Sequence, residues 1–215
     1  MRGRGSGVDF RLYLVTDRGL SGGRPLEKIV RESVAAGVTA VQLREKDATA
    51  REFLKQAFSL VKIASEFHIP LIINDRVDIA LACRAQGIHL GQSDMQCALA
   101  RRIVGDDMLI GVSVSTVEEA VEAEADGADY LGAGPIFATS TKADALPAIG
   151  LDVLRAIRRA VHIPLVGIGG IKHTNAAEVM RAGADGVAVV SAIIAHADPG
   201  AAARQLRTEI KSVNG

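Results

Sequence analysis

The stretch VQLREKD, residues 41–47, starts as an apolar strand and ends in a run of charged residues. In a strand, alternate side chains point to opposite faces, so Gln42, Arg44 and Lys46 share one face. Leu43 lies on the other face and is expected to pack against helices. Two cations this close repel each other unless an anion lies between them. The spacing therefore predicts an anion-binding site at the end of this strand.

Two aspartates follow neighbouring predicted strands, Asp75 in the sequence NDR and Asp94 in the sequence HLGQSD. Carboxylate oxygens, together with substrate phosphates, are typical ligands of Mg²⁺. Taken singly, each aspartate also fits the N-cap of the helix that follows it. The two together, beside Arg44 and Lys46, favour a site for a diphosphate and Mg²⁺.

Glycines and hydroxyls at other predicted strand ends indicate a second anion site. The pair Gly169-Gly170 lets backbone N–H groups approach a ligand closely, and Val190-Ser191 begins the short helical stretch SAII. A glycine pair is also ordinary turn chemistry. The longest predicted loop, which begins GPIFATSTK, carries Thr139, Thr141 and Lys142 and could close over ligands.

The sequence gives no sign of a covalent nucleophile. His68 and His162 each precede IP at the start of a predicted strand, and His89 lies within one, where a hydrogen-bonded core residue is expected. Cys83 and Cys97 lack ligating neighbours and are expected to be buried thiols of a reducing cytoplasm. Displacement of diphosphate therefore fits this set of residues better than hydrolysis does.

These residues follow short apolar runs that alternate with amphipathic stretches. The runs predict strands over residues 11–16, 40–44, 71–74, 87–90, 109–113, 130–133, 165–168 and 186–190. The stretches predict helices over residues 26–36, 50–67, 77–85, 96–104, 117–126, 151–160, 175–182 and 200–213. Such β-then-α alternation predicts a single-domain (β/α)8 TIM barrel. The alternative is a doubly wound open sheet, but that fold usually has a glycine-rich fingerprint where this chain reads TDRG.

Local signals mark several helix ends. The segments Thr49–Glu52 and Ser115–Glu118 have the form of capping boxes. Four phrases, AAGVTAV, AQGIHL, ADGADYL and AGADGVAV, place a glycine between a helix and the next strand. We expect the left-handed conformation at each of these glycines, because it turns the chain back into the sheet. The repetition indicates one structural unit used several times.

The composition excludes several classes of function. The 215 residues include 25 Lys plus Arg and 25 Asp plus Glu, so no net charge attracts nucleic acid or a membrane surface. Aromatic residues make up 3% and no apolar run is long enough to span a bilayer. Residues 1–10 lack the apolar core of a signal peptide, so we expect a disordered leader before a catalytic domain over residues 11–215. A cytoplasmic location is expected, and a homo-oligomer is allowed.

Nine segments resemble, in order, the motifs of the thiamine phosphate synthase family. They are LYLVTD, VQLREKD, LIINDRVDIAL, GIHLGQSD, IGVSVST, ADYLGAGPIFATSTK, GLDVLRAI, IPLVGIGGI and GADGVAVVSAI, between residues 12 and 194. The resemblance implies a Mg²⁺-dependent transferase of thiamine biosynthesis. Its substrates would be 4-amino-2-methyl-5-(diphosphooxymethyl)pyrimidine and a thiazole phosphate. Its products would be thiamine phosphate and diphosphate, formed by dissociative displacement.

The resemblance also implies roles for individual residues. Asp75 and Asp94 would hold Mg²⁺. The pyrimidine diphosphate would be bound by Gln42, Arg44, Lys46, Asn74, Ser113 and Lys142, with Glu45 completing the substrate-binding set. The thiazole phosphate would be bound by Thr139, Thr141, Gly169, Gly170, Val190 and Ser191. Arg44, Lys46, Ser113 and Lys142 would be catalytic, the cations by stabilising negative charge on the departing diphosphate.

One departure from the family pattern is visible, and two rival functions remain to be weighed. The family loop commonly reads PIFPT, whereas Ala138 replaces its second proline and removes a φ constraint. The related thiazole tautomerase lacks the aspartate matching Asp94 and the full Thr-x-Thr-Lys loop, and has a histidine where this chain has Ser115. A non-catalytic phosphate-sensing barrel would bind ligands without Mg²⁺-dependent turnover. The filled charged positions favour the synthase over both.

Overall fold

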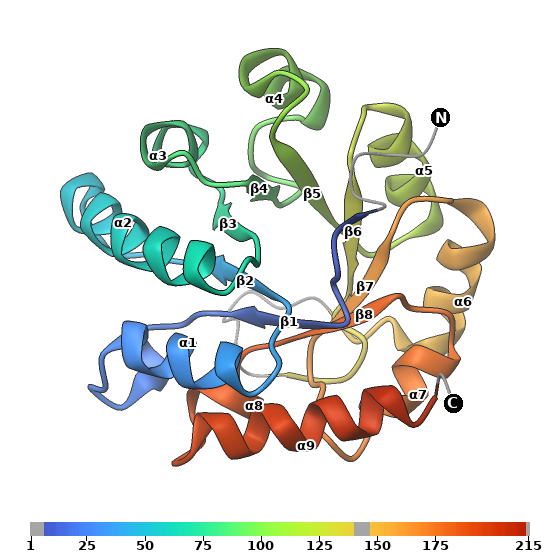
Figure 1. The fold of residues 1–215 in the computed structure, drawn as a ribbon. Helices are drawn as coiled ribbons and strands as arrows, with labels where there is room; N and C mark the ends of the chain where they lie inside the picture. Colours follow the sequence, from blue (N-terminus) through green and yellow to red (C-terminus); the bar gives the residue numbers. More distant parts are fainter. Residues whose placement is uncertain (1–6, 140–146, 214–215) are drawn as a thin grey trace.

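A computed structural model of the chain describes residues 7–139 and 147–213. In this part of the chain, eight parallel strands close into a barrel in which β8 pairs with β1 (Figure 1). The strands are β1 (Leu12–Val15), β2 (Ala40–Leu43), β3 (Leu71–Asn74), β4 (Gly87–Leu90), β5 (Leu109–Val114), β6 (Tyr130–Ala133), β7 (Leu165–Ile168) and β8 (Gly186–Val189). The predicted (β/α)8 barrel is therefore confirmed, and each predicted strand ends within one residue of the observed one.

Helices surround the barrel on its outer side (Figure 1). They are α1 (Leu26–Ala35), α2 (Ala50–Glu66), α3 (Val77–Cys83), α4 (Cys97–Val104), α5 (Val117–Ala125), α6 (Gly150–Ala160), α7 (Ala176–Arg181), α8 (Ser191–Ile194) and α9 (Pro199–Lys211). A short 3-10 helix, η2 (Gly19–Ser21), follows β1 and is absent from the sequence-based prediction. No helix within the described segments is both long and apolar enough to cross a membrane.

The strands separate two packing layers. Leu43 and Ile73 are fully buried on the outer faces, in the apolar layer under the helices, where burying one such side chain stabilises the fold by roughly 2 kcal/mol. Tyr13 and Ile72 point inward and belong to a separate, smaller cluster inside the barrel. Gln42 is buried and donates a hydrogen bond to the inward-pointing Tyr13, so the predicted alternation along β2 is confirmed.

An aromatic side chain fills the barrel at the amino-terminal end of its strands. Phe10 is 2% exposed and its ring stacks on that of Tyr130 with the centroids 4.4 Å apart. Its backbone passes so close to Gly186 that a Cβ at that glycine would overlap the Phe10 carbonyl oxygen. The leader expected over residues 1–10 thus ends in a residue of the barrel interior. Residues 1–6 lie outside the described part of the chain.

One of the two predicted capping boxes lies where the sequence places it. Thr49 accepts a hydrogen bond from the Glu52 backbone, and Glu52 Oε2 accepts one from the Thr49 backbone in return. The second prediction is wrong by one residue, because Thr116 is the N-cap of α5 and pairs with Glu119. The helix itself begins at Val117 as predicted, so the N-cap is the residue directly before it, Thr116, and not Ser115.

Three of the four predicted helix–glycine–strand junctions are confirmed. Gly37, Gly127 and Gly183 have φ angles of 112°, 91° and 103°. The prediction for AQGIHL is wrong, since Arg84 takes the left-handed conformation there, with φ of 54°, and Gly87 is the first residue of β4. Gly87 serves another purpose, because a Cβ at this position would lie 2.9 Å from atoms of β5.

Candidate active site

The predicted site residues leave their strands at one rim of the barrel, because all the strands of the described barrel are parallel. Arg44 and Lys46 follow β2, Asp75 follows β3 and Asp94 follows β4. Ser113 is the second-last residue of β5. In (β/α)8 barrels this carboxyl-terminal rim carries the active site, while the opposite rim serves stability.

Lys46, Asp75 and Asp94 form a connected group at this rim. The Nζ atom of Lys46 lies 2.7 Å from Oδ2 of Asp75. Asp75 has a left-handed backbone with φ of 61°, and its N–H donates to the His89 carbonyl at 2.8 Å, which holds the carboxylate at the end of β4. Left-handed backbone is costly for a side chain other than glycine and is often found at functional sites.

The two carboxyl groups lie next to each other. Burial raises the pKa of Asp94, and a hydrogen-bonding contact with Asp75 raises this pKa further. The Gly91 N–H, which donates to Asp94 Oδ2 at 2.7 Å, opposes the shift. Two adjacent carboxylates need a cation to be stable in their charged forms. The described residues contain no cluster of three or more side chains that could hold a metal ion. Two carboxylates completed by substrate phosphates form a ligand set that suits Mg²⁺.

Arg44 is held by the residues that follow β1. Its Nη1 atom lies 3.2 Å from Oδ2 of Asp17, and both side chains are about one-fifth exposed. Its backbone N–H donates to Oγ1 of Thr16 at 3.1 Å. Sequence reasoning missed both partners, although the segment TDRG marks a polar strand end of the same kind as the others. Asp17 orients the guanidinium before any ligand binds.

Glu45, like Arg44, pairs with a residue of the segment after β1. Its carboxylate accepts two hydrogen bonds from Arg18, at 3.1 and 2.8 Å, and its side chain is only 4% exposed. This bidentate pair joins the loop after β2 to the loop after β1. The pair gives Glu45 a structural partner, whereas its substrate contact stays a prediction.

Gln42 and Ser113 border the interior, where a set of polar side chains connects them. Gln42 Nε2 donates to the Tyr13 hydroxyl at 2.9 Å, and Ser113 Oγ lies 2.9 Å from His89 Nε2. His89 is buried and hydrogen-bonded through both ring nitrogens, as expected of a core histidine. Asn74 lies beside it in the β3–β4 register and is half-buried.

The glycine pair after β7 has the backbone that the sequence indicates. Gly169 and Gly170 have φ angles of 97° and 65°. A Cβ at Gly169 would lie 2.5 Å from Pro135, and one at Gly170 would lie 2.7 Å from the Ala138 carbonyl oxygen and from Phe137. Only glycine fits here, because the loop after β6 packs directly against this turn. The pair therefore joins the loops after β6 and β7.

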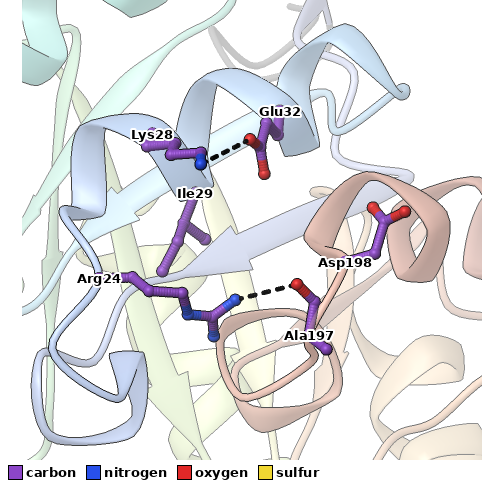
Figure 2. A pocket seen from close by; sticks show the side chains of 6 residues that line it. All are labelled: Arg24, Lys28, Ile29, Glu32, Ala197 and Asp198. Carbon is purple, nitrogen blue, oxygen red and sulfur yellow. Dashed lines mark hydrogen bonds and ion pairs between the residues drawn. The ribbon is translucent and has the colours of Figure 1, made fainter.

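Val190 and Ser191 lie where β8 passes into α8, and Arg24 binds the other end of this short helix. Arg24 Nη2 donates to the carbonyl of Ile194, the last residue of α8, at 2.6 Å, and Nη1 donates to that of His196 at 2.7 Å. The hollow around Arg24 lies on the helical exterior, between α1 and the segment leading into α9 (Figure 2). It contains none of the predicted site residues. Arg24 is occupied by backbone carbonyls at and after the end of α8, and Lys28 pairs with Glu32, so we assign the hollow a structural role.

The predicted loop residues are only partly described. Thr139 is half-buried after β6. Thr141 and Lys142 lie outside the described residues, so their predicted roles stay predictions.

The two thiols do not take part in the site. Cys83 lies in α3 and Cys97 at the start of α4, and both side chains are buried. Burial raises the pKa of both thiols, that of Cys97 to about 11, with the nearby Asp126 contributing to the latter shift. Both thiols are therefore protonated and unreactive at neutral pH.

The chain forms a closed (β/α)8 barrel, and its carboxyl-terminal rim carries Arg44, Lys46, Asp75 and Asp94. These features place it among the (β/α)8-barrel enzymes. Comparison with known proteins narrows the class. A family model described as thiamine monophosphate synthase matches residues 12–193. The chain belongs to this family.

Individual relatives agree along almost the whole chain. A protein of Chloroflexus aurantiacus named thiamine-phosphate synthase is 57% identical over 93% of this chain and 92% of its own length. One of Albidiferax ferrireducens with the same name is 54% identical over 95% of this chain and 93% of its own. The solved structure of a thiamine phosphate pyrophosphorylase from Pyrococcus furiosus is 43% identical, with a TM-score of 0.89 over 96% of this chain and 98% of that one.

Proposed function

We propose that this enzyme joins the pyrimidine diphosphate to a thiazole phosphate and releases thiamine phosphate and diphosphate. The observation that carries the proposal is the group formed by Lys46, Asp75 and Asp94 at the rim, with Arg44 beside it, in a chain of the thiamine monophosphate synthase family. Cations and paired carboxylates suit a diphosphate and its metal ion. The buried thiols support a reaction that proceeds without a covalent enzyme intermediate.

Asp75 and Asp94 are the residues that would hold Mg²⁺. When bound, the ion supplies positive charge to the diphosphate oxygens, which makes the diphosphate a better leaving group. Besides burial and the hydrogen-bonding contact with Asp75, the negative charge of Asp75 raises the pKa of Asp94, and a divalent cation would offset this repulsion. Lys46 would then exchange its ion pair with Asp75 for one with a phosphate oxygen.

The cations of the rim would bind and stabilise the leaving group. In the proposed dissociative step, the carbon–oxygen bond breaks and the diphosphate leaves with the bonding electron pair. Arg44, Lys46 and Lys142 stabilise this growing negative charge, and the amino group of the pyrimidine stabilises the positive charge left on the ring. Fixed charges that face the departing group contribute most in such reactions.

The thiazole phosphate would bind on the other side of the same mouth. The turn at Gly169 and Gly170 and the junction at Val190 and Ser191 would receive its phosphate, with Thr139 and Thr141 from the loop after β6. The nitrogen of the thiazole would then attack the pyrimidine cation to form the new carbon–nitrogen bond. No proton acceptor is required for that step, because the nitrogen attacks through its lone pair.

The test is a reaction of the purified protein with both substrates, followed by chromatography of the products. We expect thiamine phosphate and diphosphate in equal amounts, formed only when Mg²⁺ is present. Binding of either substrate without product would overturn the proposal and favour a phosphate-sensing barrel. Product formation that is unaffected by a chelator would overturn the metal requirement alone.

A further inference from the structure

A chain of hydrogen bonds crosses the barrel interior from β2 to β5. The Nε2 atom of Gln42 donates to the Tyr13 hydroxyl at 2.9 Å, and this hydroxyl lies 2.9 Å from that of Tyr130. The Tyr130 hydroxyl lies 2.9 Å from Nδ1 of His89. Nε2 of His89 lies 2.9 Å from Oγ of Ser113. The two ends of this polar chain, Gln42 and Ser113, are both predicted to contact the pyrimidine substrate.

The number of hydrogens gives the chain a direction. Tyr13 accepts from the Gln42 amide, and its single hydrogen has an acceptor in this chain only if it goes to the oxygen of Tyr130. The single hydrogen of Tyr130 then goes to Nδ1 of His89, which must accept it as an unprotonated nitrogen. A neutral imidazole with a bare Nδ1 carries its hydrogen on Nε2 and donates to Ser113. Ser113 accepts this bond, and its own hydrogen points elsewhere.

The three residues between the ends are closely held. Tyr13 and Tyr130 are 2% and 0% exposed, and burial raises the pKa of both phenols, so both keep their hydrogens. Gly111 makes room for the Tyr130 ring, which a Cβ there would overlap. Gly132 makes room for His89, whose Cε1 would lie 3.1 Å from a Cβ there. A side chain at either glycine would therefore displace one of these two rings.

We infer that Tyr13, Tyr130 and His89 are positioning residues that hold the Ser113 hydroxyl as a hydrogen-bond donor toward an acceptor nitrogen of the pyrimidine ring. The ligand in this statement rests on the proposed function, whereas the direction of the chain rests on the described contacts alone. A ring that offers a C–H in place of that nitrogen leaves the Ser113 hydrogen without its acceptor. The chain would thus select for a pyrimidine over a carbocyclic or pyridine ring.

The first test needs no substrate. Nitrogen NMR of ¹⁵N-histidine-labelled protein distinguishes the two neutral tautomers, and comparison with His89→Gln assigns the His89 signals among the five histidines. We expect the hydrogen on Nε2 in the native protein and a mixture of tautomers in Tyr130→Phe, which has no hydrogen to donate to Nδ1. A hydrogen on Nδ1, or a tautomer that Tyr130→Phe leaves unchanged, would overturn the inference.

The second test uses two pyridine analogues of the pyrimidine diphosphate, each lacking one ring nitrogen. In the native enzyme, one analogue should lose roughly tenfold in kcat/KM, the size of one hydrogen bond. In Tyr130→Phe this penalty should shrink toward one. His89→Gln, whose amide can still donate to Ser113, should keep the penalty, whereas His89→Leu should lose it. A penalty of equal size in all variants would overturn the inference.

Packing effects are separated by Phe10→Leu, which loosens the contact with Tyr130 but removes no hydrogen bond. This control should keep both the tautomer and the analogue penalty. If Tyr130→Phe does not fold, Tyr13→Phe breaks the same chain one member earlier and should shift the tautomer in the same direction. A native enzyme without turnover would overturn the proposed function, and the tautomer measurement would still decide the direction of the chain.

Discussion

The ammonium of Lys46 and the carboxylate of Asp75 form a 2.7 Å ion pair at the mouth of the barrel. The pair joins a residue predicted to bind the diphosphate to one predicted to bind the metal. The Asp75 side chain is 22% exposed and that of Lys46 is 48% exposed, so both remain accessible to a ligand. Each partner holds the other in place, and in the proposed function a phosphate and a metal ion would take over the two charges.

Removal of the Lys46 ammonium should slow the chemical step. We expect Lys46→Ala to lower kcat by roughly 10²–10³-fold, the usual loss when one group that stabilises developing negative charge is removed. Steady-state kinetics at saturating Mg²⁺ measure the effect. The matched control is Lys28→Ala, since Lys28 pairs with Glu32 on the exterior at 3.9 Å and should be neutral. Equal rates for both variants would contradict the role of Lys46.

Neutralisation of Asp94 should weaken Mg²⁺ binding while sparing the fold. Asp94→Asn keeps an oxygen for the Gly91 N–H but removes the charge beside Asp75. We expect the Mg²⁺ concentration that gives half-maximal activity to rise by at least about tenfold. Without metal, the melting temperature should not fall, because a like-charge contact is gone. Asp78→Asn, at an exposed position paired with Arg76, serves as control and should leave the Mg²⁺ dependence unchanged.

Two glycines with similar φ angles separate backbone strain from crowding. Gly22→Ala, at φ of 62° with no atom within 4 Å of the new Cβ, should lower the free energy of unfolding by about 1 kcal/mol. Gly170→Ala, at φ of 65° and 2.7 Å from the Ala138 carbonyl oxygen, should cost about 1–3 kcal/mol more. Chemical denaturation measures both. Gly170→Ala should also raise the KM for the thiazole phosphate, and an unchanged KM would separate this turn from the phosphate site.

The corrected capping box gives a stability prediction. Thr116→Ala should lower the free energy of unfolding by about 1 kcal/mol, because it removes the acceptor for the Glu119 N–H. Ser115→Ala removes only a donor to a carboxylate that keeps other partners, so its effect should be smaller. Urea denaturation of the two variants side by side decides the register. A larger loss for Ser115→Ala would restore the box first expected from the sequence.

The shifted thiol pKa of Cys97 predicts a pH dependence of stability. The pKa is about 11 in the folded chain against the ordinary value of 9.0 for a thiol, so the unfolded chain loses this proton at lower pH. Stability should therefore fall as pH rises from 9 toward 11, and this part of the fall should be absent in Cys97→Ala. Thermal unfolding across this range measures the difference between the two proteins.

A thiol reagent at pH 8 should modify native Cys97 far more slowly than the unfolded chain.

The rim could be predicted from sequence because strand alternation and strand ends are local properties. Gln42, Leu43 and Arg44 needed only the period of two, and Asp75 and Asp94 needed only their places after neighbouring strands. The capping box at Ser115 failed because two hydroxyls precede two glutamates there, and both registers satisfy the pattern. The start of α5 at Val117 selects Thr116, the residue directly before it.

The interior polar chain could not be predicted in this way. Tyr13 and Tyr130 lie 117 residues apart, each within a short apolar strand that reads as ordinary core. Only closure of the barrel brings their hydroxyls together. Asp17 was missed for another reason. The predicted strand order brings the ends of β1 and β2 together, but it does not show which side chains there form an ion pair.

The ring of Phe10 closes the amino-terminal end of the barrel, so the interior is accessible only from the carboxyl-terminal rim. It seals the end opposite the active site against Tyr130, and the space between is filled by packed side chains. In the proposed reaction, both substrates would therefore enter, and both products leave, at the carboxyl-terminal rim. A bound diphosphate would then block the binding of the next pyrimidine diphosphate. Release of diphosphate would therefore limit the rate at which a new catalytic cycle begins.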